Sequence, residues 1–241
     1  MLTFLFLKQV NTVHIYFCYT STMKKNSYHH GNLKEEFLTI AFDFIKTDDI
    51  EALTLKVLSD ATHTSRSAIY RHFRSKDALI ETMIEAGFEA FDTKISAVLN
   101  DEKMPLTERF YLGGKAYIDY ARANPNLYRL LFGHKYAAIR EEMMSIQDEE
   151  CSGFGALKKA IEEGQQSGIL KKEESFTQAV VVWSSLHGMA SLIIDGFMDV
   201  ESSWETYYDA LFKSLLAGLV SKKVTLLSTL PFAEGMLQPK S

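Results

Sequence analysis

Apolar side chains recur at three- and four-residue intervals along most of this chain, and this spacing constrains the fold more than any other feature. The first such stripe contains Leu33, Phe37, Ile40, Ala41, Phe44 and Ile45. This is the period of an amphipathic helix that buries one face. Four prolines occur in 241 residues, and turn signals do not recur at strand-like intervals. The sequence therefore predicts an all-α protein.

The composition is that of a folded globular chain, with 46% hydrophobic and 24% charged residues. Its length favours a small domain joined to a larger one. Cys18 and Cys151 lie far apart and have no CxxC partner, which indicates neither a disulfide framework nor a zinc site. We therefore expect a cytoplasmic protein that needs no cofactor.

The charge is distributed unevenly between the two parts of the chain. Residues 23–80 contain nine Lys and Arg against eight Asp and Glu, whereas residues 81–241 contain 16 against 23. The net charge is thus +1 in the first part and −7 in the second. The local electrostatic field depends on which charges share one face of the fold. The positions of these charges, and not their sum, therefore determine what the chain can bind.

The two ends of the chain look unlike the rest. Residues 1–22 lack a basic start, a cleavage site and an apolar run long enough to span a membrane. We interpret them as a non-native or disordered extension upstream of Met23, with a loosely attached tail or an interfacial anchor as the alternative. Residues 224–241 have no sustained period and are expected to be a frayed tail.

Two short helices joined by a tight turn are predicted near the start. Thr54 can cap a helix over residues 55–61, and Ser65 or Thr64 can cap another from Arg66 to His72 or Phe73. In the second helix Ala68, Ile69 and Phe73 would face inward, which leaves Arg66, Ser67, Tyr70, Arg71 and Arg74 on the other sides. This layout is typical of a helix-turn-helix unit, whose second helix enters the DNA major groove.

Longer helices follow, for a total of about nine. We expect them over residues 75–99, 105–123, 124–133, 135–166 (one or two helices), 175–194 and 203–220. Asn124 and Pro125 form a good cap and first-turn pair. Residues 175–194 contain no charged side chain, but their serines and other polar residues favour a buried helix over a membrane span.

The run TLKVLSDATHTSRSAIYRHFRSKDALI resembles the DNA-binding domain of the TetR family of transcriptional regulators, and YHHGNLKEEFL resembles the entry to its first helix. The resemblance implies phosphate contacts from Thr54, Tyr70 and Lys76, and base contacts nearest to Arg66, Ser67 and Arg71. Ser65 and His72 complete the candidate DNA-binding set. His63 departs from the family, which usually has glycine there, so we expect some strain in this turn.

The segments YARANPNLYRLLF and WSSLHGMASL resemble the C-terminal domain of one branch of TetR-type regulators, marked by Trp, His and Gly at this spacing. Trp183 and His187 lie one helical turn apart and share a face, and Gly188 lets a neighbouring helix approach closely. His187 is either a satisfied core residue or an effector contact. The domains expected are 23–80 for DNA binding and 81–223 for effector binding and dimerisation.

Aromatic residues of the larger domain are candidates for an apolar effector pocket, although an aromatic stripe at helical spacing also suits a plain core. The candidates are Phe88, Phe91, Tyr117, Tyr120, Tyr128, Trp183 and His187, with Met143 and Met144 beside them.

The last two helices have too much apolar surface to leave one face of each exposed to water. Two copies of the chain are therefore expected to pack these helices together as a four-helix dimer bundle.

These features predict a ligand-responsive repressor that binds a palindromic double-stranded DNA operator as a homodimer, without a membrane partner. The chain has no GxSxG, HExxH, phosphate-binding glycine loop or paired Cys/His cluster, so we do not expect an enzyme. The alternative is a helical small-molecule-binding or adaptor protein without DNA-specific activity. Such a protein would not need Arg66, Tyr70, Arg71 and Lys76 on one small unit.

Overall fold

In this computed structural model the described residues are 33–144, 152–198 and 204–221. They form ten α-helices and one short 3-10 helix, and within these ranges the extended structure is limited to an isolated bridge between Leu170 and Val220. The all-α prediction is confirmed, with one α-helix more than the nine expected. The extensions predicted at residues 1–22 and 224–241 lie outside the described residues.

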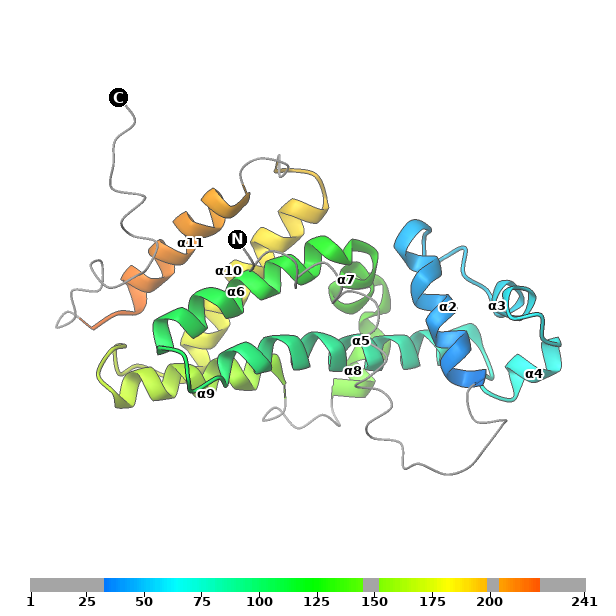
Figure 1. The fold of residues 1–241 in the computed structure, drawn as a ribbon, viewed down its shortest axis with the longest axis horizontal. Coiled ribbons are helices and arrows are strands. Elements are labelled where there is room, and N and C mark those ends of the chain that lie inside the picture. Colours follow the sequence, from blue (N-terminus) through cyan, green and yellow to red (C-terminus); the bar gives the residue numbers. More distant parts are fainter. Residues whose placement is uncertain (1–32, 145–151, 199–203, 222–241) are drawn as a thin grey trace, which may run out of the picture. The chain divides into compact units, whose positions relative to one another are not determined.

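The helices follow one another along the chain in the order drawn in Figure 1. Their bounds are α2 Leu33–Thr47, α3 Leu55–Ala61, α4 Arg66–Tyr70, α5 Lys76–Leu99, α6 Leu106–Ala123, α7 Pro125–Phe132, η1 His134–Tyr136, α8 Ala137–Met144, α9 Gly153–Gln166, α10 Ser175–Ile194 and α11 Trp204–Leu219.

These helices divide into two compact units. Unit 1 contains the described residues up to Phe91 and those from Tyr120 to Met144; unit 2 contains residues 92–119, 152–198 and 204–221. Helices α5 and α6 therefore each contribute residues to both units. The predicted domain boundary after residue 80 is a different division of the chain, and it stays a prediction.

In unit 1, helix α2 packs against both α3 and α7. Its buried residues are Phe37, Leu38, Ala41, Phe42 and Ile45. The expected stripe was partly wrong, because Ile40 and Phe44 are only half-buried while Leu38 and Phe42 are buried. Contact with helices on two sides explains a buried face that is wider than one stripe.

Local capping sets where several helices begin. The Thr54 hydroxyl accepts a hydrogen bond from the Val57 backbone N–H at 3.1 Å, as predicted. Of the two candidate caps for α4, Ser65 is the one used, with its hydroxyl accepting from the Ala68 N–H at 3.2 Å. Asn124 holds the N-cap position of α7 without a side-chain cap; its amide instead donates to the Tyr120 carbonyl.

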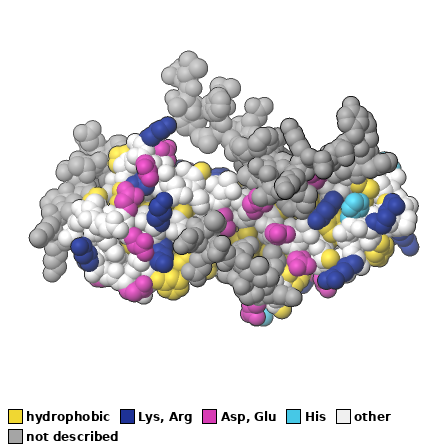
Figure 2. Space-filling view, turned by 90° about the horizontal axis from the view of Figure 1, so that it is seen from below, with side chains coloured by type: hydrophobic (Ala, Val, Ile, Leu, Met, Phe, Trp, Pro, Cys, Tyr) yellow, Lys and Arg dark blue, Asp and Glu magenta, His cyan; other side chains and the backbone are white. Residues whose placement is uncertain are grey.

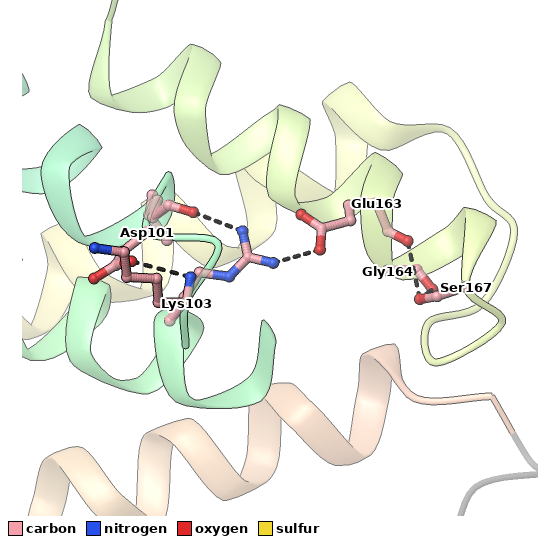
Figure 3. Close-up of polar contacts among 7 residues, drawn as sticks. Asp101, Lys103, Glu163, Gly164 and Ser167 are labelled. Carbon is pink, nitrogen blue, oxygen red and sulfur yellow. Dashed lines mark hydrogen bonds and ion pairs between the residues drawn. The ribbon is translucent and has the colours of Figure 1, made fainter. Parts of the chain in front are cut away.

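In unit 2, helix α6 is held by long-range contacts. The buried Arg109 guanidinium donates to the Leu99 carbonyl at 3.0 Å and pairs with Glu163 of α9, as Figure 3 shows. A Cβ added to Gly114 would collide with the Tyr208 hydroxyl of α11, so only glycine fits there. These contacts join α6 to the end of α5, to α9 and to α11.

Helix α10 is less buried than the sequence predicted. By length and composition it could cross a membrane, with a mean hydropathy of 1.3 in its most apolar window, but 33% of that window is buried within the chain. Thr177, Val181, Ser184, Gly188 and Leu192 are exposed. Their spacing places them on one face of the helix, so this face is available to a partner.

Candidate nucleic-acid interface

Helices α3 and α4 pack against each other and form the predicted helix-turn-helix unit (Figure 1). The turn between them is closed by a hydrogen bond from the Thr64 N–H to the Ser59 carbonyl at 2.9 Å. His63 lies in this turn with φ of +54°. The expected strain is therefore present, because a non-glycine residue occupies the left-handed region.

Helix α4 has one buried side and one exposed side. The helix ends at Tyr70, before the predicted end at His72 or Phe73. Ala68 and Ile69 within it and Phe73 just after it are buried, as predicted, with Ile69 completely inaccessible. Tyr70 is 56% exposed although it is a large aromatic residue. A short helix whose inner side is anchored in this way presents its outer side as a fixed surface.

Six of the eight residues predicted to bind DNA lie on or beside α4, and Thr54 lies at the start of α3. All of these are exposed: Thr54, Ser65, Arg66, Ser67, Tyr70, Arg71 and His72. The hydroxyls of Thr54 and Ser65 already cap α3 and α4, so a phosphate contact from either would share that oxygen. The structure thus places a compact set of donors on one small unit.

Lys76, the eighth residue, is placed differently. It is the first residue of α5 and is half-buried, and its ammonium donates to the Glu51 backbone carbonyl at 2.8 Å. In this DNA-free state the side chain therefore binds the segment between α2 and α3. A phosphate contact would require it to exchange or share this bond.

Several positive side chains lie on α4 or just after it, namely Arg66, Arg71 and Arg74. Figure 2 shows several Lys and Arg side chains, with a histidine among them, in the right-hand part of the view. The Lys34 ammonium lies 5.8 Å from the centre of the Phe73 ring. Burial, with smaller contributions from Arg71 and Lys34, lowers the pKa of His72 and so favours the neutral imidazole.

The residues predicted to bind an effector form one group in each unit. In unit 1, Phe91 packs edge-on against Tyr120 at 5.1 Å between ring centres, and Phe88 and Tyr128 are joined through Phe132 at 5.4 and 4.7 Å. The Tyr120 hydroxyl donates to the Gly87 carbonyl. Phe132, which the sequence analysis missed, is central to this group.

In unit 2, Trp183 stacks on His187 with 5.6 Å between the ring centres, as their spacing predicted. The Tyr117 hydroxyl lies 3.3 Å from His187 Nδ1. Burial lowers the pKa of His187 and favours the neutral imidazole. Phe154 of α9, also missed, packs edge-on against Trp183. Met143 and Met144 end α8, and their side chains lie outside what the structure describes.

Two further observations bear on the chemistry of the chain. Within the described ranges, no three His, Cys, Asp or Glu side chains lie close enough to hold a metal ion together.

Sequence reasoning also missed Glu51, Lys135 and Tyr136, which interact across unit 1. Glu51 and Tyr136 are 85 positions apart, so no local pattern connects them.

Two family descriptions match the chain. Residues 38–83 match "Bacterial regulatory proteins, tetR family", and residues 112–219 match "Tetracyclin repressor-like, C-terminal domain". The first contains the helix-turn-helix unit, and the second contains the Trp183 and His187 pair. Three of the four runs that carried the resemblance lie within these matches, and YHHGNLKEEFL, at residues 28–38, precedes the first match except for Leu38.

Curated relatives and solved structures are also similar. The nucleoid occlusion factor SlmA of Vibrio campbellii is 35% identical over 104 residues, 43% of this chain and 53% of that protein. The chain thus aligns with about half the length of this relative. A protein of unknown function from Rhodococcus sp. RHA1 has a TM-score of 0.68 at 23% identity, over 82% of this chain and 100% of that chain. The regulator PfmR of Thermus thermophilus has a TM-score of 0.56 at 18% identity, over 77% of this chain and 97% of that chain.

Proposed function

Because the chain belongs to the TetR family of DNA-binding transcriptional regulators, we propose that it is a ligand-responsive repressor that binds a palindromic operator as a homodimer. The observation that carries this proposal is the division of α4 into two sides. Ala68, Ile69 and Phe73 anchor the helix, and Arg66, Ser67, Tyr70 and Arg71 are presented outward.

The outward residues suit both kinds of DNA contact. Arginine can donate two hydrogen bonds to guanine in the major groove, which favours Arg66 and Arg71 as base contacts. The Tyr70 hydroxyl and the Lys76 ammonium can bind phosphate oxygens, which position the protein without reading sequence. Thr54, Ser65, Ser67 and His72 would complete the interface.

The exposed faces of α10 and α11 support dimerisation. Val181 and Leu192 are 49% and 47% exposed, and Tyr207 on α11 is 45% exposed. A Cβ added to Gly188 or Gly218 would meet no atom within 4 Å, so packing inside the chain does not require glycine at either position. Close approach by the same helices of a second copy would explain both glycines and would cover the apolar side chains.

We place effector binding in the larger domain, with the aromatic groups around Phe132 and around Trp183 as the two candidate sites. Aromatic walls bind flat or apolar molecules, and a neutral His187 beside the Tyr117 hydroxyl offers a polar contact that would orient them. The same proposal places the protein in the cytoplasm without a membrane partner. Nucleoid occlusion is a role of the relative SlmA, and none of the contacts described here favours it.

Selection of duplexes from a randomised DNA library by the full chain tests this proposal. We expect the library to yield an enriched, symmetric sequence. Arg66→Ala should bind this sequence more weakly than the wild type does, with a loss of roughly 1 to 3 kcal/mol at the base that Arg66 contacts. Arg122→Ala removes the same charge from an exposed position on α6 and serves as the control. If Arg66→Ala and Arg122→Ala bind the enriched duplex as the wild type does, α4 is not the reading helix.

A further inference from the structure

The connector between α2 and α3, residues 48–54, leads directly into the helix-turn-helix unit. It ends at Thr54, the cap of α3, and its Leu53 side chain is fully buried. Its middle residue, Glu51, is exposed but is bound by three side chains that come from elsewhere in unit 1. The connector is therefore held at two points, one apolar and one polar.

The polar point is formed by Glu51 with Lys76, Lys135 and Tyr136, which we call the Glu51 clamp. The Tyr136 hydroxyl donates to Glu51 Oε1 at 2.8 Å, and the Lys135 ammonium pairs with the same oxygen. Lys76 donates to the Glu51 backbone carbonyl at 2.8 Å. The hydrogen bond from Lys135, with that from Tyr136, holds the pKa of Glu51 below its ordinary value. Both the side chain and the backbone of the connector are thus engaged.

The segment that supplies Lys135 and Tyr136 is itself fixed. Phe132, at the end of α7, packs against Phe88 and Phe91 with 5.4 Å between ring centres in each pair. Gly133 follows, and a Cβ there would collide with the Arg129 carbonyl oxygen, so only glycine allows this tight exit from α7. The two clamp residues therefore extend from a short, firmly anchored turn.

A second contact joins the same segment to α2. The Asn126 amide, near the start of α7, donates to the Ile45 carbonyl at 2.8 Å in the last turn of α2. Arg129 donates to the Asn126 side-chain oxygen at 3.2 Å and thereby orients the amide. Carbonyls in the last turn of a helix lack partners within the helix, so this bond satisfies one of them. Residues 126–136 thus contact both the end of α2 and the connector.

Apolar packing between α2 and α7 is incomplete beside these contacts. A hollow of about 50 Å³ is lined by residues of both helices, among them Phe42, Ile45, Asn126 and Leu127. Beside this small, partly open hollow the two helices share fewer apolar contacts than they would in a filled seam. The polar contacts at Asn126 and Glu51 therefore contribute more to their relative placement than they would in a filled seam.

We propose that Glu51 is a positioning residue for DNA binding, held by Lys135 and Tyr136 so that α3 and α4 are oriented before DNA arrives. This inference rests on the proposed function, since it concerns the affinity of the same interface. This role needs no contact between Glu51 and DNA, and its carboxylate would be repelled by a nearby phosphate. Its effect is to reduce the conformational freedom that the connector loses when the protein binds.

The sign of one substitution separates this role from simple electrostatics. Glu51→Gln removes a negative charge from a DNA-binding unit, which by charge alone would strengthen DNA binding. Positioning predicts the opposite, a loss of roughly 5- to 30-fold in affinity for the duplex that the wild type selects. Asp43→Asn is the matched control, because Asp43 is an exposed acid on α2 outside the clamp, paired with Lys46.

Tyr136→Phe tests the same contact without changing any charge. It should also weaken binding several-fold, whereas the slope of log affinity against log salt should stay that of the wild type, because the same phosphates are neutralised. The thermal midpoint of each variant should fall by only a few degrees relative to Asp43→Asn, because contacts that order the connector also stabilise the folded chain, while the buried Leu53 keeps the connector folded.

The outcomes are distinguishable when full chains are measured by fluorescence anisotropy on the duplex selected by the wild type. Weaker binding of both variants at unchanged salt slope supports positioning. Binding of Glu51→Gln as tight as that of Asp43→Asn, with Tyr136→Phe equal to the wild type, overturns it and leaves the proposed function intact. Failure of the wild type to enrich any duplex overturns both.

Discussion

At the residue scale, His63 shows how one backbone angle carries a measurable consequence. It adopts φ of +54° in the turn of the helix-turn-helix unit, where glycine is the least strained residue. The sequence predicted this strain, because the surrounding motif fixes the turn and the residue type is read directly. This strain lowers the stability of the folded chain.

We expect His63→Gly to raise the free energy of unfolding by about 0.5 to 1 kcal/mol, since relief of the left-handed conformation outweighs the greater freedom of glycine in the unfolded chain. Urea unfolding at fixed protein concentration measures it. His63→Ala is the control, because it removes the same side chain but keeps the strained angle. If alanine stabilises as much as glycine, the imidazole and not the backbone is responsible.

Asp92 carries a pH dependence that was not visible in the sequence. Burial raises its pKa to about 6 from an ordinary value of 3.8, while the hydrogen bond from the Gly153 N–H opposes the shift. The folded chain therefore binds this proton more tightly than the unfolded chain does. The contribution to stability is greatest below pH 4, falls as the pH rises to about 6, and is lost above that.

We expect Asp92→Asn to raise the free energy of unfolding at pH 7 by about 1 to 3 kcal/mol, because the amide oxygen still accepts from Gly153 without a buried charge. The gain should vanish below pH 4, where the carboxyl of the wild type is protonated. Urea unfolding at both pH values checks this. A gain of equal size at both would show that the charge of Asp92 is not the cause.

At the scale of the element, features that depend on neighbouring residues were predicted well, whereas features that depend on contacts between remote segments were not. The caps at Thr54 and Ser65 and the ends of α10 follow from residues within one turn of each other. The buried face of α2 was partly wrong because it depends on α7, which is remote in the sequence. The Glu51 clamp was invisible for the same reason.

Helix α10 was expected to be buried, and we propose that a second copy covers its exposed face. Arginine in place of Val181 would bring a charge into the proposed dimer interface, where desolvation is not compensated. We expect the dimer dissociation constant to rise by about 100-fold or more, while the helical content stays unchanged. Sedimentation equilibrium measures this. Gln166→Arg, on the exposed end of α9, is the control and should remain as associated as the wild type.

At the scale of the whole molecule, the proposed function couples a DNA-reading unit to aromatic groups that we propose bind a small molecule. Coupling between two binding sites is reciprocal, so an effector that weakens operator binding by some factor must itself bind the operator complex more weakly by the same factor. This relation holds whichever aromatic group binds the effector.

Titration with candidate apolar ligands, followed by protein fluorescence, tests the coupling because Trp183 lies within one of the two groups. We expect the ligand affinity to differ about 5- to 150-fold between the free protein and the operator complex. A ligand that binds both forms equally would not be a regulatory effector, however tightly it binds.

The proposed function requires that two copies of α4 read DNA together. Hydroxyl-radical footprinting of the full chain on its selected duplex tests this claim most directly. We predict two equivalent protected half-sites related by a two-fold axis, with their centres separated by one helical turn, about 34 to 36 Å, or by a multiple of it. A single protected half-site, or protection without symmetry at saturating protein, would contradict the account.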